Sequence, residues 1–307
     1  IVSNSRILPL ETTATAMPPA SAPNAQLIGI GYMVLAASIL PVMNGLVQIL
    51  SPRYSSEQLI WARSLSHLLF IIALFAPRHG LSFLLTKKPA AQIGRSILLL
   101  ASTSLFFHGV KELPLAKAAS ISFTAPLIVA MLAWPVLGER ITIGRIVAVV
   151  LGFTGVLIVI RPGSEVFQWA SLLILGSAAC YAIYQLLTRR VAGHDPAETS
   201  AVYSVLVGSI VMTAVVPFYW RTPVDLTDAA IMSSLGVLGG LGHYFVARSM
   251  VYAAASVVTP FQYWQMVGSV IVGYFVAGKL PDAYTWTGAA VIISAGLFIL
   301  WPETRKP

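Results

Sequence analysis

Apolar stretches of about 20 residues recur ten times along this chain, with short polar connections between them. A stretch of that length is what an α-helix needs to cross the hydrocarbon core of a bilayer. The last five stretches repeat the order of the first five, and because each set has an odd number of spans, the two sets enter the membrane in opposite directions. The pattern predicts an all-α integral membrane protein whose ten transmembrane helices form two inverted five-helix repeats. The predicted spans are 27–47, 56–76, 92–110, 117–136, 142–160, 167–188, 198–218, 228–247, 254–277 and 285–301.

The repeat divides the chain into three parts. Residues 1–26 are rich in Ala, Pro, Ser and Thr and contain no apolar run, so we expect a disordered tail. We expect the first five-helix repeat over residues 27–162 and the second, inverted repeat over residues 163–302. Inverted repeats are a common architecture of secondary transporters, in which the substrate binds near the bilayer midplane between the two halves.

Prolines mark corresponding spans of the two repeats. Pro126 lies in the fourth span and Pro260 in the ninth, and Pro41 lies in the first. Proline removes a backbone donor and exposes a carbonyl group, so interrupted helices at corresponding positions indicate a transport site. A packing kink without a ligand is the alternative. We take Pro41, Pro126 and Pro260 as candidate helix-break or gating residues.

The ten spans, the turn Gly138-Glu139-Arg140-Ile141-Thr142 and the glycines of the span after it, such as Gly155, resemble the EamA-type carriers of the drug/metabolite transporter superfamily. The resemblance covers about residues 27–301. Lys279 departs from it, because the family often has an acidic residue there. The resemblance implies a central cavity between the halves and the export or exchange of small metabolites. Exporters of amino acids, including aromatic ones, are one branch of that family.

Composition supports the membrane class and indicates an orientation. The chain is 57% hydrophobic and 10% charged, whereas soluble domains carry roughly 25% charged residues. Its net charge of +8 comes from Lys and Arg in short connections, which favours a topology signal over nucleic-acid binding. Of the 19 Lys and Arg residues, 12, including Arg95, fall on the side of both termini, 6 fall on the other side, and Arg63 falls within a span. We expect a multi-pass protein of the bacterial inner membrane with both termini in the cytoplasm, in contact with the lipid bilayer and with no nucleic acid.

Polar and aromatic side chains inside the spans are costly in lipid and usually face a cavity. Several share one helical face, as Tyr181 and Tyr184 do in the sixth span. Together, the amides, hydroxyls and rings suit a small zwitterion with an apolar side chain. Hydrogen bonding between helices is the alternative for Ser, Thr and Asn. The candidate substrate-binding residues are Asn44, Gln48, Arg63, His67, Phe106, His108, Tyr181, Tyr184, Gln185, Tyr203, His243, Tyr244, Gln262, Tyr263 and Trp264.

The ionisable residues among these candidates each allow two interpretations. Arg63 matches the geometry of a substrate carboxylate, but it can also reach the headgroups or donate to backbone carbonyls. His108 and His243 have a side chain that titrates near physiological pH and can carry a proton. A helix-end histidine without a transport role is the alternative for each of them.

Some functions are disfavoured because their residues are absent from the sequence. No Asp or Glu lies in the middle of a predicted span, which disfavours strict proton antiport of cationic drugs. We find no phosphate-binding glycine loop, metal-ligand cluster or nucleophile–base arrangement, so we expect no enzyme activity, no cofactor and no metal.

The sequence predicts a secondary transporter that moves a small-molecule substrate, a neutral or zwitterionic metabolite, by alternating access. Export of amino acids with apolar or aromatic side chains is the favoured activity. One alternative is a transporter of a larger metabolite, nucleotide-like or vitamin-like. The other is a receptor or scaffold that does not transport. The pattern leaves the oligomeric state open.

Overall fold

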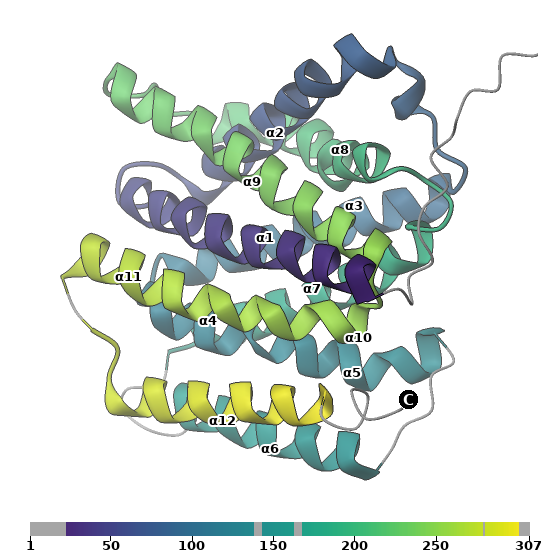
Figure 1. Cartoon of the computed structure of the whole chain (residues 1–307). Helices are drawn as coiled ribbons and strands as arrows, with labels where there is room; N and C mark the ends of the chain where they lie inside the picture. Colours follow the sequence, from purple (N-terminus) through teal and green to yellow (C-terminus); the bar gives the residue numbers. More distant parts are fainter. Residues whose placement is uncertain (1–22, 138–142, 163–167, 279, 301–307) are drawn as a thin grey trace, which may run out of the picture.

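The computed structural model describes residues 23–137, 143–162, 168–278 and 280–300, and in these residues the regular secondary structure is helical (Figure 1). The elements before residue 162 are α1 (Pro23–Leu50), α2 (Ser56–His79), η1 (Ser82–Leu84), α3 (Pro89–Val110), α4 (Leu115–Ser122), α5 (Thr124–Leu137) and α6 (Ile143–Ile160). Those after residue 168 are α7 (Ala170–Val191), α8 (Ala197–Val215), η2 (Val216–Phe218), α9 (Leu226–Tyr252), α10 (Ala255–Val258), η3 (Thr259–Trp264), α11 (Gln265–Ala277) and α12 (Ala283–Leu300).

The predicted tail differs from the structure at its end. α1 begins at Pro23, so residues 23–26 are helical and do not belong to the tail. Proline favours the first turn of a helix, because its missing N–H has no helical partner there. Residues 1–22, the predicted turn at 138–142 and Lys279 lie outside the described residues.

Among the described residues, seven helical stretches are long and apolar enough to cross a membrane. They are α1, α2, α3, the stretch Leu115–Leu132 formed by α4 and α5, α7, α8 and α9. Two shorter apolar helices accompany them, Ile146–Ile160 within α6 and Ala283–Phe298 within α12. The ninth predicted span is divided among α10, η3 and α11. The chain is therefore an all-helical membrane protein of long and short apolar helices.

Both of the spans that carry prolines at corresponding positions are interrupted. The fourth span is divided into α4 and α5 at Phe123, and Pro126 is the third residue of α5, where a missing N–H breaks no helical hydrogen bond. The ninth span changes to a 3₁₀ helix, η3, of which Pro260 is the second residue. The two interruptions meet, because the rings of Phe123 and Tyr263 lie edge to face with their centroids 5.4 Å apart. Pro41, in contrast, lies inside α1, which continues without a break.

The two ends of α1 define two sides of the molecule, which we call the Pro23 side and the Leu50 side; the Leu50 side is to the left in Figure 1. Near the end of α1, Gln48 donates to a backbone carbonyl of the loop after α3 at 3.0 Å. Just before α7, Gln168 donates to the carbonyl oxygen of Glu112 in the same loop at 3.2 Å. Thus α1 and α3 end on the Leu50 side whereas α7 begins there, and α7 runs opposite to α1.

The helices pack in pairs that are related between the two halves of the chain. α1 packs against α9 and α3 packs against α7. Likewise, α1 packs against α11 and α5 packs against α7, while α2 pairs with α8 and α6 with α12. α1 and α7 are the first helices of their halves, and α3 and α9 are the third long helices. When each helix is replaced by its counterpart in the other half, every one of these pairings becomes a pairing that the structure contains.

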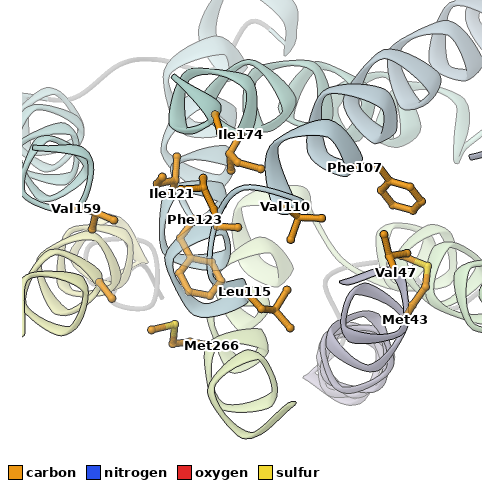
Figure 2. Close-up of a cluster of buried hydrophobic side chains, with 14 of the residues drawn as sticks. Met43, Val47, Phe107, Val110, Leu115, Ile121, Phe123, Val159, Ile174 and Met266 are labelled. Atoms are coloured by element: carbon orange, nitrogen blue, oxygen red, sulfur yellow. The ribbon is translucent and has the colours of Figure 1, made fainter. Parts of the chain in front are cut away.

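The largest hydrophobic cluster joins both halves. At its edge α6 and α12 approach closely, because a Cβ added at Gly155 would lie 2.8 Å from the carbonyl oxygen of Gly288. Small residues permit such contact between membrane helices. Figure 2 shows members of the cluster, among them Met43 and Val47 of α1, Phe107 and Val110 of α3, Leu115 and Ile121 of α4, Phe123, Val159 of α6, Ile174 of α7 and Met266 of α11.

Candidate functional site

A central cavity lies between helices of both halves. The first half contributes α1, α2, α3 and α4, and the second contributes α7, α9, η3 and α11. Its volume is about 110 Å³. Small-molecule sites usually have roughly 300 to 1,000 Å³, so this cavity has to widen to hold a metabolite larger than an amino acid. The polar residues that line it are Asn44, Arg63, Ser102, Thr103, Ser122, Ser177, Tyr181, His243, Gln262, Gln265 and Ser269.

Arg63 of α2 is held at the wall of the cavity by two neighbouring side chains. Its Nη1 donates to the hydroxyl of Thr103 at 3.2 Å, and its Nη2 lies 2.8 Å from Nε2 of His243. A guanidinium only donates hydrogen bonds, so Nε2 of His243 accepts here and the ring proton is on Nδ1. That Nδ1 lies 3.4 Å from the hydroxyl of Tyr184, which can accept from it. The contacts therefore assign one neutral tautomer to His243.

The charge of Arg63 has no carboxylate counterion in the part of the chain that the structure describes. The side chain is 3% exposed, and among the described residues no carboxylate pairs with it. Its Nε is buried and has no hydrogen-bond partner among those residues either. A buried cation without compensation is costly, so the site favours an acidic or strongly polarised oxygen beside Arg63. A solute in the cavity can supply that oxygen.

A second buried arginine, Arg95, extends this network toward the Pro23 side. Its Nε donates to Thr188 at 3.0 Å, its Nη2 donates to Tyr184 and to Ser204 at 3.3 Å each, and its Nη1 donates to Gln92. The side chain is fully buried within α3. The prediction that Arg95 belongs to a connection between spans is therefore wrong. α3 begins at Pro89, so Arg95 lies inside the helix bundle.

The network ends at Asp195, in the connection between α7 and α8. Its carboxylate accepts from the side chains of Thr86 and Gln92, the latter at 2.8 Å, and from the backbone N–H of Lys87 at 2.9 Å. Burial raises the pKa of the Asp195 carboxyl, but these hydrogen bonds together lower the pKa by more than burial raises it. The pKa of Asp195 therefore lies below its ordinary value. A carboxylate thus faces the polar chain that leads to Arg95.

Toward the Pro23 side, the cavity ends at a pair of glutamines. Gln185 of α7 and Gln262 of η3 donate to each other's side-chain oxygens, at 3.3 Å and 3.1 Å. Beside them lies a hydrophobic cluster that includes Val258 of α10 together with Met33 of α1 and Val246 of α9, which line the cavity. This end of the cavity is bordered by one polar contact and one apolar cluster.

On the Leu50 side lies a second, larger hollow of about 630 Å³. It lies between the ends of α1, α3, α6 and α11 and the beginnings of α4 and α12. Basic and acidic side chains share its lining, among them Lys111, Glu112, Lys117 and Asp282. Charged side chains of both signs therefore surround a hollow on the Leu50 side.

The structure brings together part of the residues expected at the substrate site. The candidates that line the cavity are Asn44, Arg63, Phe106, Tyr181, His243 and Gln262. Three more candidates contact lining residues without lining the cavity themselves. They are Tyr184, Gln185 and His67, whose ring stacks on His243 at a centroid distance of 6.1 Å.

The structure places the remaining candidates outside the cavity, in loop contacts, at the periphery or in the core. A polar stripe shows which residues share a helical face, but it does not show whether that face meets the cavity, another helix or lipid. These residues are Gln48 and Tyr203, which donate to backbone carbonyls; His108, 3.1 Å from the Glu57 carboxylate; Tyr244, which donates to Glu198; Trp264, half exposed and donating to Ser38; and Tyr263, packed on Phe123.

Six polar lining residues are missing from the sequence-based candidates: Ser102, Thr103, Ser122, Ser177, Gln265 and Ser269. Gln265 and Ser269 follow Gln262 at helical spacing, so the stripe that contains Gln262 carried a signal for both. Ser122 is the last residue of α4, directly before the interruption at Phe123, and no periodicity marks it. Its position depends on where α4 stops.

Comparisons with known proteins agree with this architecture. The model of the EamA-like transporter family matches the chain twice, over residues 27–161 and 168–301. A solved crystal structure with 19% sequence identity superposes with a TM-score of 0.68, covering 92% of this chain and 99% of that chain, which is a likeness of fold.

Two similar proteins span almost the whole chain. An S-adenosylmethionine uptake transporter of Rickettsia felis is 28% identical over 279 residues, which cover 91% of this chain and 94% of the relative. A riboflavin transporter of Rhizobium johnstonii is 29% identical over 293 residues, which cover 92% and 94%.

Proposed function

We propose that this chain, which belongs to the EamA-like transporter family, carries a metabolite with a planar heterocyclic ring across the bacterial inner membrane by alternating access. Membership of this family makes the chain a membrane transporter. The proposal concerns the substrate class, the topology and the mechanism.

The names of the similar proteins favour a larger metabolite over amino-acid export. S-adenosylmethionine and riboflavin each join a fused, nitrogen-rich ring system to a hydroxylated five-carbon unit, which is a ribose ring in the first and an open chain in the second. Neither name refers to an amino-acid exporter. We therefore place the vitamin-like or nucleotide-like alternative first and the export of apolar or aromatic amino acids second.

The observation that carries the proposal is the combination of groups in the central cavity. Phe106 and Tyr181 offer aromatic faces for a planar ring, and the amides of Gln262 and Gln265 offer donors and acceptors to its edge. Arg63 offers a charge-assisted hydrogen bond to a carboxylate or carbonyl oxygen. A ring with polar edges and at least one oxygen acceptor uses all three kinds of group.

We propose ten membrane crossings in two inverted repeats, with the Pro23 side in the cytoplasm. The opposite directions of α1 and α7 and the related helix pairings support the inversion. To the seven long stretches, the proposal adds α6, α12 and the divided segment of α10, η3 and α11. The excess of Lys and Arg on the Pro23 side supports the orientation, and it remains after Arg95 is removed from the tally.

Uptake into proteoliposomes tests the proposed substrate class. Labelled riboflavin and S-adenosylmethionine are compared with labelled phenylalanine and methionine, using the purified wild-type protein. We expect transport of at least one of the two heterocyclic compounds and weaker transport of the amino acids. Transport of the amino acids alone would reverse the order of the two candidates.

The variant Arg63→Met tests whether the cavity described above is the site. It removes the guanidinium but keeps an unbranched side chain, and we expect at least about a tenfold loss of uptake, the equivalent of one charge-assisted hydrogen bond. His108→Gln is the matched control, because this residue is half exposed and pairs with Glu57 away from the cavity. Equal uptake by Arg63→Met and the wild type would place the site elsewhere.

A further inference from the structure

The glutamine pair at the Pro23 end of the cavity connects a residue that lines the cavity to one that does not. Gln262 lines the cavity, whereas Gln185 lies behind it and is fully buried. Each side-chain nitrogen donates to the other residue's oxygen, at 3.3 Å and 3.1 Å, so the pair is reciprocal. Such a pair uses one N–H and the C=O of each amide, side by side on one edge.

The edge that Gln185 presents to Gln262 also occurs on planar heterocycles. A ring nitrogen that carries hydrogen next to a carbonyl offers a donor and an acceptor with the same spacing as a primary amide. A solute with that edge can therefore make both hydrogen bonds of Gln185 to Gln262. Separation of the pair without a replacement would leave two buried amides unpaired, which is unfavourable in a dry site.

Gln262 is placed where such an exchange would affect the closure of the cavity. It belongs to η3, the 3₁₀ segment that interrupts the ninth predicted span and has Pro260 as its second residue. Its Nε2 also lies 3.6 Å from the sulfur of Met33, a member of the apolar cluster beside the pair. Loss of the contact with Gln185 would free η3 from α7 at this end of the cavity.

We propose that Gln262 determines substrate specificity by recognising an N–H/C=O edge of the heterocycle, which takes the place of Gln185. The exchange releases the closure on the Pro23 side, and Gln185 then meets the water that enters. Binding and opening are thereby coupled through a single side chain. This inference rests on the proposed function, because it concerns the substrate class of the same cavity.

The test compares the two members of the pair with riboflavin as the probe. Riboflavin carries the required edge at N3, and N3-methylriboflavin lacks the N–H. In proteoliposomes, we expect Gln262→Leu to raise the KM for riboflavin by at least about tenfold. We expect it also to lose the preference for riboflavin over the methylated compound. Gln185→Leu should keep the preference with a KM at or below that of the wild type, because nothing has to be displaced.

This asymmetry separates recognition from a structural role. A pair that only stabilises the fold would show the same loss from either substitution, and that result would overturn the proposal. A Gln262→Leu protein that still rejects N3-methylriboflavin would also overturn it. Gln58→Leu is the matched control, since Gln58 is a fully buried glutamine paired with the backbone of Arg221 on the Leu50 side; its KM and preference should match the wild type.

A second measurement keeps the test informative if the wild type transports neither riboflavin nor S-adenosylmethionine, in which case the proposed function fails. A cysteine is introduced by Val246→Cys in a Cys180→Ser background, and its labelling by a membrane-impermeant maleimide is followed from the Pro23 side. We expect Gln185→Leu to raise the labelling rate several-fold over the Gln58→Leu control. Uracil, which carries the edge, should raise it in the unaltered pair, and 1,3-dimethyluracil should not. Unchanged labelling with Gln185→Leu, or equal labelling with the two uracils, would overturn the inference.

Discussion

Replacement of Arg95 by methionine should destabilise the protein strongly, although the side chain lies outside the cavity. Methionine has a similar length and no donors. The side-chain oxygen of Gln92 accepts a hydrogen bond from Arg95 and is buried, so it would be orphaned at a cost of roughly 1–3 kcal/mol. The Asp195 carboxylate would also lose the cation at the other end of this polar chain. Together these losses resemble the breaking of a buried ion pair, which costs about 3–5 kcal/mol.

A loss of that size is a large share of the roughly 5–15 kcal/mol that separates folded and unfolded states. We expect the midpoint of thermal unfolding of the detergent-purified protein to fall by on the order of 10 °C. Intrinsic tryptophan fluorescence and the elution of the monodisperse protein after heating would report the change. Arg190→Met is the matched control, because Arg190 is exposed at the end of α7 on the same side.

The difference between the two midpoints decides whether the hydrogen bonds of Arg95 and its neighbours stabilise the fold. If Arg95→Met unfolds within about 2 °C of Arg190→Met, the buried hydrogen bonds contribute no net stability and the reasoning fails. A cycle with Tyr184→Phe adds a further check, since Arg95 Nη2 donates to the Tyr184 hydroxyl. The two substitutions should then be less than additive, because they remove a shared contact.

Two further predictions concern helix packing and pH. Gly155→Ala should lower the free energy of unfolding by about 1–3 kcal/mol, because its Cβ would collide with the Gly288 carbonyl. Gly31→Ala is the control: no atom lies within 4 Å of its added Cβ, so the unfolding midpoint should be unchanged or slightly raised. Equal midpoints for the two variants would contradict the close contact of α6 and α12. Because hydrogen bonds hold the pKa of Asp195 below its ordinary value, this carboxylate stabilises the fold above about pH 4 and the contribution is lost as the pH falls further. Unfolding midpoints measured between about pH 7 and about pH 3 should therefore fall more steeply at the acidic end for the wild type than for Asp195→Asn. Parallel curves would contradict this role.

Much of the architecture could be predicted from the sequence, because a bilayer demands long apolar helices and tolerates little else. The prolines of the fourth and ninth predicted spans predicted interruptions, and the structure divides both spans. Pro41 shows the limit of that reasoning. It lies within an unbroken α1, where Gly268 of α11 leaves room for its ring: a Cβ on Gly268 would lie 2.8 Å from the Pro41 Cγ. Whether a proline interrupts a helix depends on neighbours that the local sequence does not reveal.

The candidate site could be predicted only in part, because polarity within a span has several causes. Arg63, His243 and Gln262 were found since polar groups at those depths need partners, and here they face the cavity. Trp264 sits beside Gln262 in the sequence but faces outward, at 51% exposure. Arg95 shows the opposite failure: as a basic residue near a span end it was expected in a connection, and packing against α7 and α8 buries it. Neighbouring positions on a helix point in different directions, so a shift of one residue decides whether a side chain faces the cavity, another helix or the outside.

The symmetry of the two halves gives the closure on the Pro23 side a counterpart on the Leu50 side. Exchanging the halves relates α7 to α1 and the interruption at η3 to the one at Phe123. On the Pro23 side, the contact of Gln185 with Gln262 joins α7 to η3. The related contact would join α1 to the region of α4. These two helices touch, and Gln48 and Leu115 beside this contact line the hollow of about 630 Å³. Under the proposed alternating-access mechanism, the hollow on the Leu50 side should close when the glutamine pair on the Pro23 side separates. That closure should bring α1 and α4 into tighter contact as η3 leaves α7, because the proposed mechanism exchanges the conformations of the two halves.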